Sequence, residues 1–217
     1  MKSILLIGLG DLGQKIAVQL YDKNCEVMAV DIVEERVEDV MPYVTNGQIG
    51  DCTDKAFLKE LGINNYDLIF NTIGGDFKSS LESTLTLKEL GAKYIVARAD
   101  DETHEKLLRH IGADSVLYPE KQMARWAAIR YGSDHVLDFI SLDDEHAVYE
   151  LEVPSNWIGL TIGKLDIRKK YNINIVALKN NGKFNPTITA ETELTPGTTM
   201  LVMGETKQIQ KYFHVLS

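Results

Sequence analysis

The residues whose types and spacing could do chemistry lie near the N-terminus, in the glycine turn Gly8-Leu9-Gly10-Asp11-Leu12-Gly13 and at Asp31. In a G-x-G-x-x-G turn, the first glycine permits a tight bend and the second lets the backbone approach a pyrophosphate. The third lets a helix pack closely on a strand, and the first N–H groups of that helix can bind phosphate oxygens. An acid such as Asp31 can accept hydrogen bonds from both hydroxyls of an adenosine ribose. This set predicts a nucleotide-binding site.

The elements needed to position this turn surround it in the sequence. The apolar run Ile4–Ile7 ends at the turn, and apolar residues then recur at helical spacing from Ile16 to Leu20. A second apolar run, Val27–Val30, ends in Asp31. The order strand, turn, helix, strand and acid is the context that the motif requires. The simpler alternative is a glycine turn that binds nothing, and the flanking strands and the acid favour the nucleotide site.

The alternation of strand and helix continues to about residue 118. Strands are expected near 48–49 and over 66–71, 94–97 and 115–118, and helices over 33–41, 54–61 (capped by Thr53), 77–90 and 103–111. Short connections between alternating elements predict a Rossmann-like, doubly wound parallel sheet with helices on both faces.

Ligands of such sheets lie beyond the carboxyl ends of the strands. Here each expected strand ends in a residue that could take part: Asp31, Asp51, the run Thr72-Ile73-Gly74, Arg98 and Glu120. We expect Ile73 to pack on the base, Arg98 to face negative charge and Glu120 to hold a divalent cation near the phosphates. The alternative is that strand ends are polar only because loops are solvated.

The pattern changes at Pro119-Glu120-Lys121-Gln122-Met123. Apolar residues from Met123 to Ile129 cover a wide helical face, a turn at 132–134 breaks the helix, and 136–140 is expected to form a second short helix. This segment, 119–141, is too apolar to lie free on a surface. It either packs on its own domain or forms a partner interface, and the residues leave both possibilities open.

The pattern of the remaining segment, 142–217, predicts a small β-rich lobe. Strands are expected over 147–153, 173–178 and 199–203, helices over 161–171 and 207–213, and turns over 154–159 and 194–197. Asn180-Asn181-Gly182 predicts a tight hairpin, because both central positions of such a turn favour positive φ. A core of about 70 residues is marginal alone and gains from dimerisation.

Composition excludes several classes of protein. The chain of 217 residues carries 32 acidic and 23 basic side chains, a formal charge of −9, which disfavours a nucleic-acid partner. The sequence has no apolar run long enough for a membrane span and no signal peptide, so we expect a cytoplasmic protein without direct membrane insertion. Cys25 and Cys52 are expected to be reduced and buried. The five histidines are expected at the surface: His104, His110, His135, His146 and His214.

The order of parts resembles a Ktr/Trk-type potassium-uptake regulatory subunit of the RCK (KTN) domain family. The stretches that carry the resemblance are the glycine turn with Val30-Asp31, Gly50-Asp51-Cys52-Thr53, Thr72-Ile73-Gly74, Leu87–Gly91, Lys106–Asp114, Pro119–Met123 and Asp166–Tyr171. The resemblance runs nearly end to end. It implies an RCK N-lobe at 1–118, a crossover helix-turn-helix hinge at 119–141 and a small α+β RCK C-lobe at 142–217.

Function and partners also follow from the resemblance. It implies a cytoplasmic regulatory (gating) subunit of a potassium uptake system, without enzymatic activity, peripheral to the inner face of the cell membrane. The partner is a membrane potassium transporter or channel, and homodimers assemble into an octameric ring. An adenine nucleotide, ADP, ATP or NAD(H), binds the N-lobe with Mg or Ca, and cyclic di-AMP binds the C-lobe of some relatives.

The family's binding residues map onto particular positions of this sequence. The nucleotide set is Gly8, Gly10, Asp11, Leu12, Gly13, Asp31, Ile32, Asp51, Cys52, Thr72, Ile73, Gly74, Arg98 and Glu120, with Glu120 at the cation position. The second-ligand set is Arg168, Asn174 and Ile175.

One position departs from the family pattern. Close relatives carry arginine where this chain has Asp11, between the second glycine and the next apolar residue. A carboxylate facing a terminal phosphate adds repulsion, so the sequence predicts a weaker preference for ATP than for ADP, AMP or NAD(H). The alternative is that Asp11 points to solvent and only supports the helix N-terminus.

A small NAD(P)-dependent oxidoreductase is the competing class, because it explains the glycine turn equally well. Its hydride-transfer chemistry needs a positioned acid or base, and the sequence offers neither a Tyr-x-x-x-Lys pair nor a His–carboxylate arrangement. The sequence therefore favours a regulatory subunit over an oxidoreductase.

Overall fold

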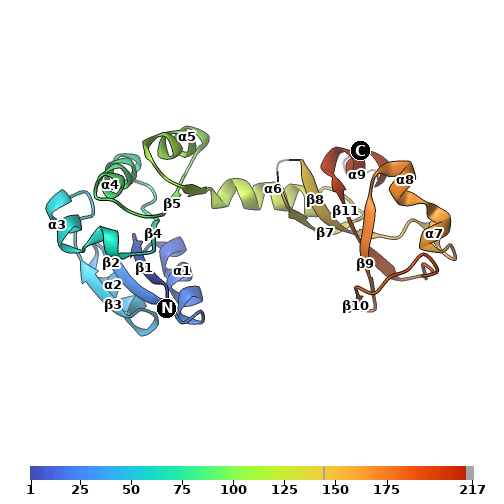
Figure 1. The fold of residues 1–217 in the computed structure, drawn as a ribbon, viewed down its shortest axis with the longest axis horizontal. Coiled ribbons are helices and arrows are strands. Elements are labelled where there is room, and N and C mark those ends of the chain that lie inside the picture. The colour runs from blue at the N-terminus through green and yellow to red at the C-terminus, as the bar shows by residue number, and fades with distance from the viewer. Residues whose placement is uncertain (144, 214–217) are drawn as a thin grey trace. The chain divides into compact units, whose positions relative to one another are not determined.

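Six parallel strands form the sheet of the N-terminal unit in the computed structural model, which describes residues 1–143 and 145–213 (Figure 1). They are β1 (Ser3–Ile7), β2 (Glu26–Asp31), β3 (Asn46–Ile49), β4 (Leu68–Asn71), β5 (Ile95–Arg98) and β6 (Ser115–Leu117). Their order is β3-β2-β1-β4-β5-β6. The chain returns from β3 to β4 across β1, so the strand order reverses between β1 and β4, and the parallel doubly wound sheet is confirmed.

Helices cover both faces of this sheet because successive side chains of a strand point to opposite faces. Ile4 and Leu6 belong to one buried cluster, with Ala17 and Val37, whereas Leu5 and Ile7 belong to another. The helices are α1 (Asp11–Tyr21), α2 (Glu34–Val40), α3 (Lys55–Glu60), α4 (Phe77–Glu89) and α5 (Glu102–Ile111), with 3-10 turns at Met41–Tyr43 and Ile63–Asn65.

Aspartate side chains begin three of these helices by accepting a hydrogen bond from a backbone N–H of the first turn. Asp76 accepts from Ser79 N at 3.0 Å, and Asp101 accepts from His104 N at 2.8 Å. The prediction that Thr53 caps α3 is wrong, because Asp54 accepts from Ala56 N at 2.8 Å. Thr53 instead donates to Asp51 Oδ1 from both its backbone and its hydroxyl.

Helix α6 (Pro119–Tyr131) begins in the first of two compact units, Met1–Lys121, and continues into the second, Gln122–Ser217. The expected second helix over 136–140 is wrong: these residues lie in strand β7 (Val136–Ser141). Val136 and Phe139 are both buried at a spacing of three, which resembles a helix. That spacing arises from a register shift between Val136 and Asp138, where a bulge inserts an extra residue.

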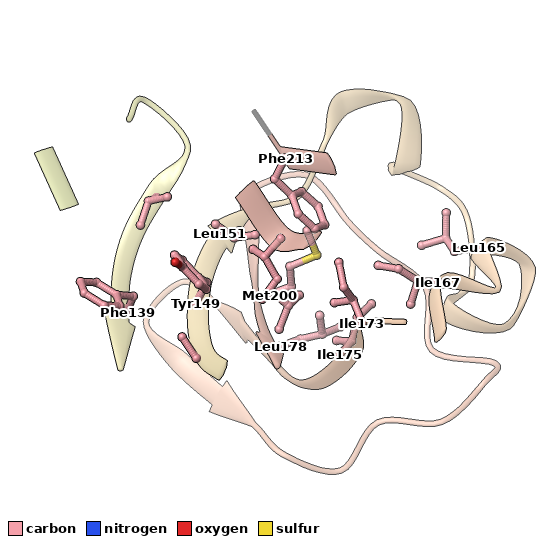
Figure 2. Close-up of a cluster of buried hydrophobic side chains, with 14 of the residues drawn as sticks. Phe139, Tyr149, Leu151, Leu165, Ile167, Ile173, Ile175, Leu178, Met200 and Phe213 are labelled. Carbon is pink, nitrogen blue, oxygen red and sulfur yellow. The ribbon is translucent and has the colours of Figure 1, made fainter. Parts of the chain in front are cut away.

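The second unit contains a five-stranded antiparallel sheet in the order β10-β9-β11-β8-β7. Its further strands are β8 (His146–Glu152), β9 (Asn174–Asn180), β10 (Lys183–Asn185) and β11 (Thr198–Glu205). The hairpin between β9 and β10 is confirmed, with positive φ at Asn181 and Gly182. Figure 2 shows the core of this sheet, in which the Phe139 and Tyr149 rings stack with centroids 5.6 Å apart.

Short helices accompany this sheet. They are α7 (Ile162–Leu165), α8 (Ile167–Tyr171) and α9 (Thr206–Phe213), with a 3-10 turn at Ser155–Trp157. The single helix expected over 161–171 is broken at Asp166, which adopts a left-handed conformation with φ of 50°. Among the described residues, no helix is long and apolar enough to cross a bilayer.

Close packing of α1 on the glycine turn gives a stability prediction. A Cβ at Gly13 would lie 2.0 Å from Gly8 O and 2.9 Å from Thr72 Oγ1. We expect Gly13→Ala to lower the free energy of unfolding by about 1–3 kcal/mol, because backbone atoms must move apart. Urea unfolding of the whole chain measures it. Gly10→Ala is the control, since a Cβ there meets no described atom within 4 Å, and a Gly13→Ala protein as stable as this control would contradict the packing argument.

Candidate functional site

A cavity of about 250 Å³ opens at the carboxyl ends of the parallel strands, where the strand order reverses. Ten of the residues expected from the sequence line it: Gly8, Gly10, Asp31, Ile32, Asp51, Cys52, Thr72, Ile73, Gly74 and Arg98. The lining also includes Arg36, Gly50, Thr53, Asp76 and Ser79, which the sequence analysis did not assign to the site.

The glycine turn forms the floor of the cavity. Gly8 has φ of +84°, and a Cβ there would lie 2.8 Å from Ile73 N, so the turn requires glycine at this position. The Thr72 hydroxyl donates to Ile7 O at 2.9 Å, which ties the end of β4 to the turn. At Gly10, by contrast, the protein itself leaves room for a side chain among the described residues. The open space above Gly10 is where a ligand can approach the backbone.

Asp31 is buried, with 6% of its surface exposed, and its carboxylate is held at both oxygens. Oδ2 accepts from Leu9 N at 2.6 Å and Oδ1 accepts from Val33 N at 2.9 Å. The Arg36 guanidinium lies 3.7 Å from Oδ2. Each carboxylate oxygen has a further lone pair, so Asp31 can still accept from ribose hydroxyls, in an orientation that the backbone fixes. A basic residue one turn into the helix after the acid was the signal for Arg36.

Residues after β3 and β4 form the walls of the cavity. The Asp51 carboxylate is exposed, and its Oδ1 accepts from the backbone N–H and the hydroxyl of Thr53. Ile73 is half-buried and Ile32 is two-thirds exposed. Cys52 is buried, and burial, with the nearby charge of Asp51, raises the pKa of its thiol to about 12. Cys25 is only half-buried, so the expectation that both cysteines are buried holds for Cys52 alone.

Arg98 faces carboxylates of its own unit. Its Nη2 donates to Glu120 Oε1 at 3.0 Å, and its Nε lies 3.2 Å from Asp100 Oδ1. That Nε contact is an ion pair without hydrogen-bond geometry, and Nε is a buried donor that lacks a hydrogen bond within the described part of the chain. A Cβ at Gly74 would lie 2.9 Å from the guanidinium carbon, so a larger residue there would displace the guanidinium.

Asp11, Leu12, Gly13 and Glu120 do not line the cavity. Asp11 is exposed and is the first residue of α1, where its charge favours the helix N-terminus. Leu12 and Gly13 lie in the first turn of α1, where Gly13 packs against Gly8 and Thr72. Glu120 is the second residue of α6 and pairs with Arg98. In the described ranges, no three His, Cys, Asp or Glu side chains gather as a metal site.

A hollow of about 370 Å³ in the second unit brings together the three residues expected to bind a second ligand. Arg168 Nε donates to Asn174 Oδ1 at 2.5 Å, and Ile175 lies beside them on β9. The opposite side is formed by Ile188, Thr189 and Ala190, which the sequence analysis did not assign.

His104 corrects the expectation that the histidines lie at the surface. It is 1% exposed, because α5 carries it under the Phe77 ring, whose centroid is 4.9 Å away. His110, His135 and His146 are exposed as expected. His214 lies outside the described residues.

The fold and the cavity define a Rossmann-like domain with a glycine turn at its switch point, followed by a small antiparallel α+β domain. Family models match the TrkA-N domain over residues 4–119 and the TrkA-C domain over residues 147–217. Two proteins of Bacillus subtilis (strain 168) align over 97% of the chain. Ktr system potassium uptake protein C is 37% identical, and the alignment spans 96% of its length. Ktr system potassium uptake protein A is 34% identical, and the alignment spans 95% of its length. The chain therefore belongs to the Ktr/Trk potassium uptake family of TrkA-N and TrkA-C domain proteins.

Solved structures agree on the fold. The GsuK RCK domain matches all of this chain with a TM-score of 0.66 at 21% identity, and the chain spans 48% of it. The GsuK channel bound to NAD matches all of this chain with the same TM-score and identity, and the chain spans 39% of it. The chain thus covers less than half the length of these solved chains, and at this identity the likeness shows the RCK-type fold alone.

The raised pKa of Cys52 predicts slow thiol chemistry inside the cavity. The thiolate is the reactive form, so labelling of Cys52 by a maleimide should stay slow until the pH nears about 12. Mass spectrometry of the Cys25→Ser protein measures the rate at Cys52 alone. In urea the rate should rise to that of an ordinary cysteine. A folded protein that is labelled at the unfolded rate at neutral pH would contradict the burial of this thiol.

Proposed function

We propose that the chain is a regulatory subunit of a potassium uptake system and that an adenine nucleotide or dinucleotide binds the cavity of its N-terminal unit. The observation that carries the proposal is the combination of open space at Gly10 with the fixed carboxylate of Asp31. Phosphates would bind at the N-terminus of α1, and the ribose hydroxyls would donate to Asp31. Ile73 would pack on the adenine.

Relatives support this assignment. The two Bacillus proteins are named as potassium uptake proteins, and GsuK, which shares the fold, has been solved with NAD bound. The resemblance further suggests a membrane potassium transporter or channel as the partner, a homodimer that assembles into an octameric ring, and a location at the inner face of the membrane. A nucleotide can shift such a ring only by binding one arrangement more tightly than another.

The contacts of Arg98 suggest how a ligand could reach α6. Arg98 lines the cavity, and its partner Glu120 stands in the first turn of α6. A phosphate that takes the guanidinium would weaken its bond to Glu120, and the freed carboxylate could then hold Mg or Ca beside the phosphate. Movement of α6 would then carry the signal, in place of the two-helix hinge expected from the sequence.

An oxidoreductase remains the alternative that shares this fold. The buried histidine beside the cavity, His104, has both ring nitrogens in hydrogen bonds to the protein, which leaves it ill placed for proton transfer to a substrate. Binding of NAD(H) without turnover, in the presence of candidate alcohols and ketones, supports the regulatory assignment.

For the second unit, cyclic di-AMP remains the ligand we propose for the hollow at Arg168 and Asn174.

Substitution at Gly10 tests the cavity directly. A Cβ at Gly10 meets no described atom within 4 Å and stands in the space proposed for the ligand, so we expect Gly10→Val to fold and to bind nucleotide at least tenfold more weakly. In a thermal-shift panel of ATP, ADP, AMP, NAD+ and NADH, ligand at about 100 times its Kd stabilises the wild type by about 2.7 kcal/mol. The variant should lose about 1.4 kcal/mol of that.

The neighbouring residue provides the matched control. Asp11→Asn changes an exposed side chain outside the cavity and should leave NAD+ stabilisation intact. If Asp11 faces a terminal phosphate, the same variant should bind ATP more tightly than the wild type does. Equal stabilisation of wild type and Gly10→Val by every nucleotide would refute the assignment of the cavity.

The pairing of Arg98 with Glu120 gives a second prediction. Glu120→Gln should raise the affinity for ADP about two- to fivefold without divalent cation, because Arg98 loses a competing carboxylate that is half exposed. The same variant should lose any gain in affinity from Mg or Ca. Titration calorimetry with and without the cation measures both.

Glu102→Gln is the control for this pair, since Glu102 pairs with Lys121, the next residue of α6, at 3.3 Å. The control should bind ADP as the wild type does. If Glu120→Gln weakens ADP binding in the absence of cation, Glu120 assists the ligand and does not compete with it.

A further inference from the structure

His104 stands where two loops that reach the cavity come together. Its Nδ1 accepts a hydrogen bond from Asp100 N at 3.3 Å, in the loop that follows β5. Its Nε2 lies 3.2 Å from the Ser80 hydroxyl of α4. Since the backbone N–H can only donate, Nδ1 carries no proton and Nε2–H donates to Ser80. Both nitrogens are therefore satisfied only in the neutral ring.

Each partner of His104 leads on to a residue of the cavity. The Asp100 carboxylate accepts from Gly75 N at 2.9 Å and lies 3.2 Å from Arg98 Nε. On the other side, Ser80 O accepts from Asn71 Nδ2 at 3.2 Å, and Asn71 Oδ1 receives Ile73 N at 3.4 Å. The Asp100 carboxylate thus joins the loop after β4 to the loop after β5 directly, and the buried imidazole holds Asp100 in place by bonding its N–H and the Ser80 hydroxyl of α4.

The charges around His104 are unevenly distributed. Asp100 and Asp101 face it from its own loop and favour its protonation, while burial lowers the pKa below 6.5 and is the larger effect. From α4 it meets the uncharged Phe77 and Ser80. The charge of Asp76, at the start of α4, is bound to Ser79. The neutral His104 ring contributes to the stability of the fold above about pH 6.5, and this contribution is lost as the pH falls through the lowered pKa of His104 in the folded state.

We infer that neutral His104 is a positioning residue, which holds the Gly75 and Asp100 loops in register so that Arg98 and Ile73 can meet a nucleotide. Protonation puts a hydrogen on Nδ1, and the bond from Asp100 N is then lost. Ligand affinity should therefore fall as the ring becomes charged. The inference rests on the proposed nucleotide site and adds a pH-dependent control of it.

Three variants separate positioning from packing. His104→Phe keeps a ring beside Phe77 but removes both nitrogens. His104→Asn keeps an acceptor near the place of Nδ1 and cannot titrate. His110→Asn is the matched control, since His110 is exposed on the same helix and bonds to Lys106 O of its own turn.

NAD+ is the probe, because its pyrophosphate diester keeps one charge state between about pH 8 and about pH 5, the range of histidine titration. Titration calorimetry of the full chain should show that the affinity for NAD+ decreases as the pH is lowered, both in the wild type and in His110→Asn. His104→Asn should bind as the wild type does at the upper pH and lose the pH dependence. His104→Phe should bind about three- to tenfold more weakly at every pH, the value of one positioning hydrogen bond.

Amide hydrogen exchange in the ligand-free protein supplies a second readout. Protection of the Asp100 and Gly75 amides should fall at low pH in the wild type, and at all pH values in His104→Phe. This arm decides the positioning role even if the wild type binds no NAD+, an outcome that would defeat the proposed function by itself. The inference is overturned if His104→Phe keeps wild-type protection of both amides, or if His104→Asn keeps the pH profile of the wild type.

Discussion

The fold of the candidate site depends on the buried carboxylate of Asp31. It ends β2, accepts Leu9 N from the glycine turn and accepts Val33 N from the start of the next loop. The glycine turn and the turn after β2 are thereby held together by a single side chain. An unpaired carboxylate in this position would be costly to bury, and unpaired N–H groups of the turn would be costly as well. The group that would recognise a ribose is thus the same group that holds the turn in place, so folding orients the carboxylate before any ligand arrives.

What the sequence could predict follows from how local each signal is. The glycine turn, the strand before it and the acid after the next strand lie within the first 31 residues, and the parallel sheet follows from regular alternation. The family resemblance then supplied the two-lobe order, and the TrkA-N and TrkA-C matches follow one another along the chain in that order. Six of the cavity residues were predicted from strand ends, where topology brings them together: Asp31, Asp51, Thr72, Ile73, Gly74 and Arg98. Gly8 and Gly10 followed from the glycine turn, and Ile32 and Cys52 from the family resemblance.

Two of the failures have a different cause. The strand β7 looked helical because its bulge places Val136 and Phe139 on one face at helical spacing, and only pairing with β8 reveals the extra residue. His104 looked like a surface residue because its charge class is usually exposed, and its burial depends on Phe77 and Ser80 from a different helix. Arg36 was missed although its signal was local, because a basic residue lies one turn into the helix that follows Asp31. The outcomes at β7 and His104 are decided by tertiary contacts that no local pattern records.

The charge of the cavity limits which ligand it can hold. Its lining carries three carboxylates, Asp31, Asp51 and Asp76, against two guanidinium groups, Arg36 and Arg98. Arg98 is further neutralised by Glu120 and Asp100. A phosphate chain therefore gains little from the side chains and must rely on the N–H groups at the start of α1, on displacement of Glu120 from Arg98, or on a cation that it brings with it. Each added phosphate charge increases the need for such compensation by N–H groups, Arg98 or a cation. If a nucleotide binds here, the carboxylates around Arg98 disfavour ATP relative to ligands with fewer phosphate charges, in the same direction as the prediction from Asp11.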